Sequence, residues 1–292
     1  MPDIVCDNRE ETADWIETTL LVRGRPIGID QLNSVAAEDC GISESQVGTG
    51  LQAMSIRARI LGSLYPFTIV PGLYVEQKPH ASKTLYSTML FLSPGSPYRQ
   101  LFASQPTGEM VVLFERLVAR AMQSFLGTQA VVIRFGWPGE IGRPERFNDA
   151  IEWLAGLMEI RAGTSFRPPL RKDGGVDVVA WRPFPDRRTS FPTWLVQCTV
   201  QREVVSKSRD IDVRNWSNWL AFDVDPSTVL AVPGLISRTE VWNEIALRTL
   251  VLDRIRIVGL LEDCIAEQIE FGLDFNDLAI QRLRTRLSGA DE

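Results

Sequence analysis

The chain has 292 residues, of which 45% are hydrophobic, so it can bury a sizeable core in one large domain or two smaller ones. No apolar stretch approaches the roughly 20 residues that span a bilayer, and the first residues have neither the basic segment nor the apolar core of a secretory signal, so we expect a cytoplasmic protein without membrane contact. Four cysteines without a CxxC pair and a single histidine exclude the common zinc sites and a histidine-based acid/base mechanism.

The first hundred residues predict a mainly helical domain. Apolar periodicity predicts helices at residues 12–21, 29–39 and 43–61. Gly41-Ile42-Ser43 between the last two resembles the corner of a helix-turn-helix, and residues 65–76 have the pattern of two strands that would form a wing. A winged helix would read DNA or a partner protein through its second helix, whereas the alternative is an ordinary turn between two packed helices. The proline- and glycine-containing segment 93–108 predicts a connector, which gives domains at 1–100 and 101–292.

Helices and strands alternate in the second domain. The predicted elements are a helix (109–126), a strand (130–135), a loop (136–144), a helix (146–160), a hairpin (172–199), a helix (204–219), a strand (229–233), a helix (239–249), a strand (256–260) and a C-terminal helix (262–287). This alternation predicts an α/β sheet with helices on both faces.

The hairpin carries the most informative residues of the chain. Asp173-Gly174-Gly175 predicts a turn, because glycine accepts a positive φ without steric strain. An acid, Asp177, opens the apolar strand that follows, and an amide, Gln197, interrupts the strand after it. Two adjacent strands would bring these side chains together, and carboxylate and amide oxygens are hard ligands suited to Mg²⁺. The alternative is a buried Asp177 satisfied by backbone amides, with Gln197 on an edge strand.

These residues resemble a known family. Asp-Gly-Gly-hydrophobic-Asp, followed about twenty residues later by a Gln-x-Lys strand, is similar to the PD-(D/E)XK nuclease superfamily, and most closely to its Mrr-like restriction branch. The resemblance implies a restriction-endonuclease-like mixed sheet flanked by helices, with Asp177 and Gln197 as ligands of Mg²⁺ or Mn²⁺. It further implies an endonuclease acting on DNA in restriction or antiphage defence, with a second copy of the chain or a defence-system protein as a further partner.

The sequence departs from the family pattern at the lysine, because Thr199 stands where that residue is expected. A threonine cannot carry the charge that steadies a developing phosphorane. Arg202 or Lys207 could supply it from the following segment, and we prefer Lys207 as the catalytic residue because arginine is a poor base near neutrality. The resemblance also implies an acid on the upstream helix. Glu115 matches that motif, with Glu159 as a rival and a solvated boundary glutamate as the alternative.

Charge is distributed unevenly along the chain. The whole chain is acidic, with 31 Lys and Arg against 37 Asp and Glu, yet residues 161–209 hold ten basic residues against four acidic ones. Basic side chains dominate affinity for phosphate backbones, so this segment predicts nucleic-acid contact, a solvated arginine-rich loop being the alternative. The candidate contacts are Arg171, Lys172, Arg187, Arg188, Arg202 and Arg209.

Three functions are compatible with the sequence. The first is a Mg²⁺-dependent endonuclease that uses Asp177, Gln197, Lys207 and Glu115. The second is a nuclease-like subunit that has lost catalysis and binds nucleic acid or scaffolds a defence complex, as Thr199 suggests. The third is an α/β interaction protein that has no connection to nucleic acid.

Overall fold

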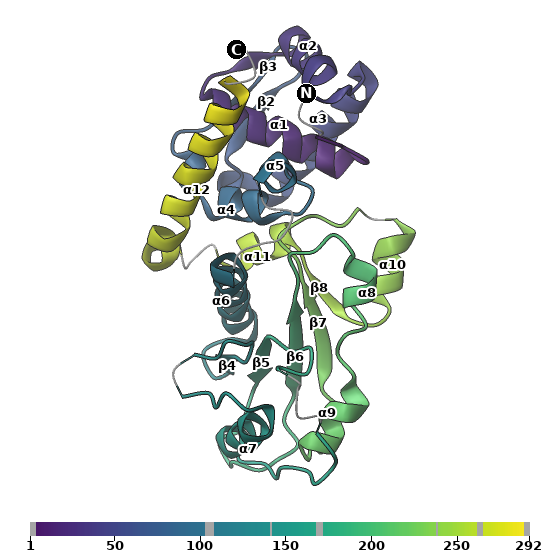
Figure 1. Cartoon of the computed structure of the whole chain (residues 1–292), viewed down its shortest axis with the longest axis vertical. Coiled ribbons are helices and arrows are strands. Elements are labelled where there is room, and N and C mark those ends of the chain that lie inside the picture. The colour runs from purple at the N-terminus through teal and green to yellow at the C-terminus, as the bar shows by residue number, and fades with distance from the viewer. Residues whose placement is uncertain are drawn as a thin grey trace. The chain divides into compact units, whose positions relative to one another are not determined.

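The computed structural model of the chain describes residues 4–102, 108–140, 142–167, 172–237, 239–261 and 265–288. The chain forms two compact units, each described here by itself (Figure 1). Unit 1 comprises Met1–Met110, Pro233–Ser237 and Asp253–Glu292, and unit 2 comprises Val111–Val232 and Arg238–Leu252. Unit 1 is therefore assembled from segments that precede, interrupt and follow unit 2 in the sequence.

Unit 1 combines helices with a small antiparallel sheet. Its helices are α1 (Arg9–Arg23), α2 (Ile29–Cys40), α3 (Glu44–Leu61), α4 (Leu85–Leu92), α5 (Pro97–Phe102), α11 (Arg254–Leu260) and α12 (Ile265–Ser288), with 3₁₀ turns at Gly62–Leu64 and Ala81–Lys83. The strands β1 (Ile27–Gly28), β2 (Phe67–Val70) and β3 (Tyr74–Gln77) lie in the order β1-β3-β2. The pair of strands expected within residues 65–76 is thus confirmed as the β2–β3 hairpin.

Local capping explains where the long helices of unit 1 begin. The Asn8 side chain accepts hydrogen bonds from the first amides of α1. Ser43 and Gln46 form a capping box at the start of α3, where each side chain accepts from the other residue's backbone N–H. Gly24 and Gly41 end α1 and α2 in the left-handed conformation that glycine adopts without strain.

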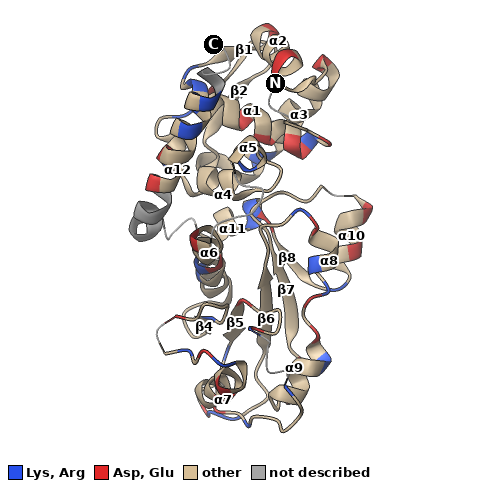
Figure 2. Ribbon diagram, in the orientation of Figure 1, with Lys and Arg blue, Asp and Glu red and all other residues tan. Residues whose placement is uncertain are grey.

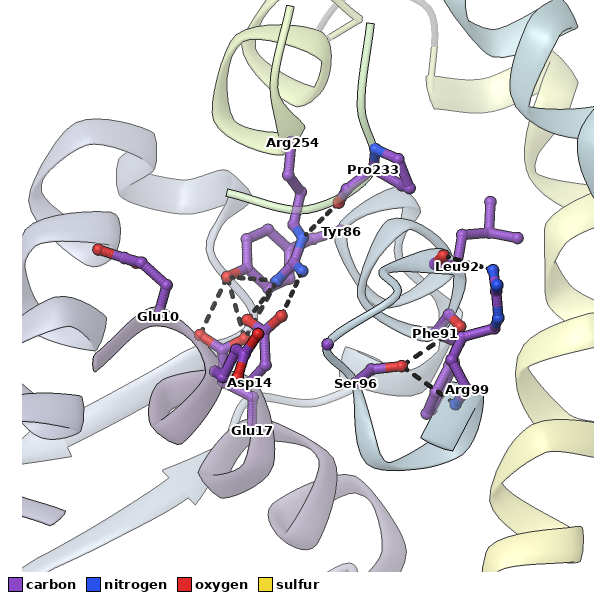
Figure 3. A network of polar contacts seen from close by, with 12 residues as sticks. Glu10, Asp14, Glu17, Tyr86, Phe91, Leu92, Ser96, Arg99, Pro233 and Arg254 are labelled. Atoms are coloured by element: carbon purple, nitrogen blue, oxygen red, sulfur yellow. Dashed lines mark hydrogen bonds and ion pairs between the residues drawn. The ribbon is translucent and has the colours of Figure 1, made fainter. Parts of the chain in front are cut away.

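A buried ionic network holds the segments of unit 1 together (Figure 3). The Arg57 guanidinium on α3 donates to Asp14 Oδ1 and Glu17 Oε1 on α1, both at 2.8 Å. Arg254 on α11 donates to both Asp14 oxygens at 3.0 and 2.8 Å. The Tyr86 hydroxyl on α4 donates to Glu17 Oε1 at 2.9 Å. Because the ions are buried and paired, removing any one of them would leave its partner as an uncompensated buried charge.

Unit 2 is built on a mixed five-stranded sheet. Its helices are α6 (Gly108–Leu126, whose first residues belong to unit 1), α7 (Phe147–Met158), α8 (Val204–Lys207), α9 (Val213–Trp219) and α10 (Glu240–Ala246), and its strands are β4 (Val131–Arg134), β5 (Val178–Trp181), β6 (Thr193–Cys198), β7 (Ser227–Ala231) and β8 (Leu250–Leu252). The strand order is β4-β5-β6-β7-β8. The β4–β5 and β5–β6 pairs are antiparallel, whereas β6–β7 and β7–β8 are parallel. The predicted α/β class is therefore confirmed.

An aromatic cluster packs α7 and α9 against this sheet. Phe147 on α7 contacts Trp216 and Trp219 on α9 edge-to-face, at centroid distances of 6.4 and 5.2 Å. Val179 and Leu195, from β5 and β6, belong to the same buried cluster. The Trp216 indole N–H donates to the Gly174 carbonyl at 3.2 Å, which fixes α9 beneath the glycine turn. These tryptophans serve the core of unit 2, as their spacing on one helical face indicates.

Three sequence-based expectations need correction. Residues 256–260 form part of helix α11 and not a strand, because the Asp253 side chain caps the Arg256 N–H and begins a helix; the last strand is β8. A short apolar run does not distinguish the two structures by periodicity. The single helix expected at 204–219 is interrupted between α8 and α9, where Asp212 caps a new helix.

The division of the chain also differs from the consecutive domains expected at 1–100 and 101–292. The C-terminal helix α12 packs against α1 and α4 of unit 1 and is not part of unit 2. Sequence adjacency could not show this, because α12 finds its apolar partners in the N-terminal helices. Among the described helices, none combines the length and the apolar character needed to cross a membrane.

Candidate functional site

The start of β5 and the end of β6 bring Asp177 and Gln197 together. Val178 pairs with Val196 in the antiparallel register, which places Asp177 opposite Gln197. The Asp177 N–H donates to the Val196 carbonyl at 2.8 Å, and its own carbonyl accepts from the N–H groups of Phe135 and Gly136 at 2.7 and 2.9 Å. Three segments of the sheet therefore fix the backbone of Asp177, and the proximity expected from the hairpin is present.

Within the described structure, the Asp177 carboxylate accepts hydrogen bonds through only one of its two oxygens. Its Oδ2 accepts from the Cys198 N–H at 2.7 Å and from the Gln197 side-chain amide at 3.1 Å. Burial, and then the nearby charge of Glu115, raise the pKa of Asp177 well above its usual range. A cation placed beside Asp177 would offset both effects and favour the ionised carboxylate.

The Gln197 side chain leaves its carbonyl without a partner. Its amide nitrogen donates to Asp177 Oδ2 and to the Cys198 carbonyl, while Oε1 is buried and accepts no hydrogen bond from the part of the chain that the structure describes. An orphaned buried acceptor is unfavourable and calls for an explanation, such as a catalytic role or a bound water or ion. Here it belongs to the side chain whose amide nitrogen contacts the Asp177 carboxylate.

Glu115 joins the site from helix α6. Arg134, at the end of β4, donates from Nε to Glu115 Oε2 at 2.6 Å, and both side chains are buried. Burial is the largest effect on Glu115 and raises its pKa to about 7, although Arg134 opposes the shift. A Cβ at Gly136 would lie 2.7 Å from Glu115 Oε2, so a larger residue here would displace this carboxylate from its present position. Of the two upstream acids considered, the structure brings Glu115 to Asp177.

The rival acid, Glu159, lies elsewhere. It ends α7 in the left-handed conformation, and its side chain is 57% exposed, with Arg187 Nη1 at 3.8 Å. Thr199 is buried, and its hydroxyl accepts from the Gln201 N–H at 3.1 Å. The thiol of Cys198 is also inert, because burial and the charge of Asp177 raise its pKa well above the usual range.

Lys207 does not take part in the contacts of the Asp177 carboxylate. Its ammonium group on α8 forms an ion pair with Asp210 Oδ2 at 2.7 Å. The Asp210 carbonyl faces Gly175, where a Cβ would lie 2.8 Å from the oxygen. The Lys207–Asp210 pair therefore packs next to the glycine turn, and Arg134 is the cation that lowers the pKa of Asp177.

The expected nucleic-acid contacts occupy separate segments, and acidic residues lie among them (Figure 2). Arg187 and Arg188 are in the loop between β5 and β6, at the opposite end of the hairpin from Asp177, each 3.8 Å from an acidic side chain. Arg209 pairs with Glu244, and the Lys172 ammonium lies over the Trp137 ring at 4.3 Å.

The two remaining candidates are Arg202 and Arg171. Arg202 is exposed in the turn after β6, at the Gln197 end of the hairpin, and Arg171 lies outside the described residues. The basic segment of the sequence is therefore dispersed in space, because its hairpin carries Arg187 and Arg188 away from the end that holds Asp177.

Sequence reasoning missed Arg134 and Arg143. Both are buried arginines of unit 2, and Arg143 stacks on the Phe135 ring with its guanidinium carbon 4.5 Å from the ring centroid. The signal for Arg134 was present in the sequence, because it is the one charged residue in the otherwise apolar strand Val131–Arg134. A buried charge in a strand indicates a specific partner.

No group of three or more histidine, cysteine, aspartate or glutamate side chains within the described ranges is arranged to hold a metal ion. This finding does not apply to a site formed by Asp177 and the Gln197 amide, because glutamine is not among these residue types. Comparison of the chain with protein-family models, with curated proteins and with solved structures found no match.

Proposed function

We propose that this protein is a Mg²⁺-dependent endonuclease that hydrolyses phosphodiester bonds of DNA. The observation that carries the proposal is the pair of Asp177 and Gln197 on neighbouring strands, where the buried Gln197 carbonyl lacks a hydrogen-bond partner in the described part of the chain. A carboxylate and an amide carbonyl are hard oxygen donors of the kind that Mg²⁺ or Mn²⁺ selects, and an ion bound by both would require the Gln197 amide to turn its carbonyl, instead of its nitrogen, toward Asp177.

The residues fit such a metal ion, with Asp177 and Gln197 as its protein ligands. When bound, the ion would polarise a phosphate oxygen and lower the pKa of a coordinated water. Glu115 has a pKa of about 7, so its carboxylate can take up a proton near neutrality. Arg134 supplies a buried positive charge beside these acids, the role that Thr199 cannot fill.

The architecture of unit 2 supports the same proposal. A helix bearing an acid, the antiparallel neighbours β4, β5 and β6, and the parallel β7 agree with the mixed sheet flanked by helices that the family resemblance implies. We propose that the protein acts in restriction or antiphage defence in the cytoplasm, as the family resemblance implies, with a second copy or a defence-system protein as partner.

Unit 1 supports a role in binding DNA. Its helices α2 and α3, joined at Gly41-Ile42-Ser43, and the β2–β3 hairpin that follows them are compatible with the winged helix that the sequence suggests. We propose that α3, which follows the Gly41-Ile42-Ser43 corner, faces the nucleic acid, because that is the position of the recognition helix in this arrangement.

A specific observation favours a second candidate function, that of a nuclease-like subunit without catalytic activity. Thr199 replaces the expected lysine, and Lys207 is engaged with Asp210. Arg134 in turn is paired with Glu115. A site in which both of these cations are paired with carboxylates would bind nucleic acid or scaffold a defence complex without cleaving.

Cleavage of supercoiled plasmid DNA tests the proposal. Wild type, Asp177→Asn, Lys207→Gln and the matched control Asp186→Asn are compared with Mg²⁺, Mn²⁺ or EDTA. Asp186 is an exposed acid in the loop at the far end of the same hairpin, so its loss should change nothing. We expect metal-dependent nicking by wild type and by Asp186→Asn, and none by Asp177→Asn.

Each other outcome has a defined meaning. Equal nicking by Asp177→Asn and wild type would overturn the proposed site. DNA binding without nicking by wild type in any metal would establish the second candidate. Loss of nicking in Lys207→Gln would assign the missing charge to Lys207, whereas unchanged nicking would leave that role to Arg134.

A further inference from the structure

Arg134 has one guanidinium nitrogen without a partner. Its Nε donates to Glu115 at 2.6 Å and its Nη1 donates to the Pro138 carbonyl at 2.8 Å. Its Nη2 is buried and, within the described ranges, makes no hydrogen bond. The residue is 6% exposed, so this arm of the fork is enclosed next to the pair with Glu115. A donor on a permanently charged group is rarely left unpaired in such a place.

Arg143 shows the same feature. Its two terminal nitrogens donate to the carbonyls of Pro144 and Lys172, both at 2.8 Å, and its Nε is buried without a partner in the described structure. Arg143 stacks on Phe135, whose N–H donates to the Asp177 carbonyl. The two arginines are thus connected through the segment that also fixes Asp177.

The surrounding backbone makes room for this pair of guanidinium groups. A Cβ at Gly139 would lie 2.8 Å from Arg143 Cδ, just as one at Gly136 would meet the carboxylate that holds Arg134. Burial lowers the pKa of Arg143, the charge of Asp173 raises it and the charge of Arg134 lowers it, so both of these charges lie within electrostatic reach of Arg143. A guanidinium nitrogen that has no partner can still donate to an anionic oxygen.

We propose that Arg134 and Arg143 form an anion site that binds a phosphate group of the nucleic-acid substrate next to the Asp177–Gln197 metal site. This inference rests on the proposed function and names the side chains that replace the charge missing at Thr199. In the described structure, each guanidinium fork has one nitrogen left to donate to a phosphate oxygen, and its other donors hold it in a fixed plane, which a lysine ammonium group does not provide. The two orphaned donors and the orphaned Gln197 carbonyl then have complementary roles, the donors toward phosphate and the acceptor toward the metal.

The test uses two assays. The first measures the affinity for a short DNA duplex as a function of salt concentration, with Ca²⁺ in place of Mg²⁺. The second measures plasmid nicking in Mg²⁺. Wild type is compared with Arg134→Gln, Arg143→Gln and the control Arg182→Gln. Arg182 follows the other end of β5 from Asp177 and is exposed. Each phosphate contact that is lost should lower the slope of log K against log salt by about 1, and a merely structural defect would not.

We expect the lower slope in Arg134→Gln and Arg143→Gln and the wild-type slope in Arg182→Gln. Arg134→Lys and Arg143→Lys, which retain the charge without the fork, should recover the slope but not the nicking rate. Circular dichroism checks that each glutamine variant is folded. If one of them is unfolded, the lysine variant at the same position provides the comparison. A wild-type nicking rate in that lysine variant would contradict the role of the fork.

The outcomes separate the two proposals. Nicking by wild type, with unchanged slopes in both glutamine variants, would overturn the anion site and leave the nuclease standing. Reduced slopes without nicking by wild type would overturn the nuclease and retain the anion site. Absence of both DNA binding and nicking in wild type would overturn both.

Discussion

The carboxylate of Asp14 receives two hydrogen bonds from the guanidinium of Arg254, 240 residues later in the sequence. Both residues belong to unit 1, so this ion pair closes the unit after the chain has traversed unit 2. Arg57 donates to the same carboxylate at 2.8 Å, and all three side chains are buried. The pair therefore links the N-terminal helices of unit 1 to the segment Asp253–Glu292, which follows unit 2 in the sequence.

Substitution of Asp14 by Ala should destabilise unit 1 by about 3–5 kcal/mol, because two buried arginines lose their shared partner. Arg254→Ala should have an effect of similar size, and the double variant should lose less than the sum. Urea denaturation followed by circular dichroism measures these free energies. Arg256→Ala, an exposed arginine on the same helix, serves as control and should stay within about 0.5 kcal/mol of wild type. A similarly small loss in Asp14→Ala would contradict the role of the network.

Gly136→Ala should lower stability and disturb the site, because the new Cβ would lie 2.7 Å from Glu115 Oε2. We expect a loss of about 1–3 kcal/mol, as for other overpacked positions. Gly156→Ala is the matched control within α7, where a Cβ meets nothing within 4 Å. It should raise stability by about 0.5–1 kcal/mol, because alanine favours the helix. Thermal unfolding of the two variants tests both signs, and a stabilised Gly136→Ala would show that Glu115 can move away.

The stability of unit 2 should fall between pH 4.5 and about pH 7 through Glu115. Its pKa rises from 4.5 to about 7 on folding, mainly through burial, so the folded state retains a proton that the unfolded state has released. The contribution of Glu115 to the free energy of unfolding is fully present below pH 4.5 and is lost as the pH rises through 7. The total loss is at most about 3 kcal/mol. Denaturation across this range should show a shallower slope for Glu115→Gln than for wild type. Equal slopes would show that Glu115 is ionised throughout.

Thr199→Lys tests whether only the charge is missing from the site. Residues 197 and 199 project to the same side of an extended chain, so a lysine here would extend toward the Gln197 amide. We expect Mg²⁺-dependent nicking to increase about tenfold or more, the effect of adding one donor to a developing anion. Thr199→Met provides similar bulk without charge and should match wild type. An equal increase in both variants would exclude charge as the cause.

The sequence alone determined the local parts of this protein. The glycine turn at 174 and 175, where both residues adopt positive φ, follows from residue type. The Asp177–Gln197 pairing follows from two adjacent strands and a period of two. The long helices α1, α3 and α6 and the β2–β3 hairpin follow from apolar periodicity and capping, which are properties of neighbouring residues.

Tertiary structure decided what depends on distant partners. Helix α12 joined the N-terminal unit, and Arg254 paired with Asp14, 240 residues earlier in the chain. The arginine beside Asp177 proved to be Arg134, which lies on another strand more than forty positions earlier in the chain. The physical reason is common to these cases. A buried charge or an apolar face is unfavourable until it finds a partner, and only the folded chain determines which of the distant groups that partner is.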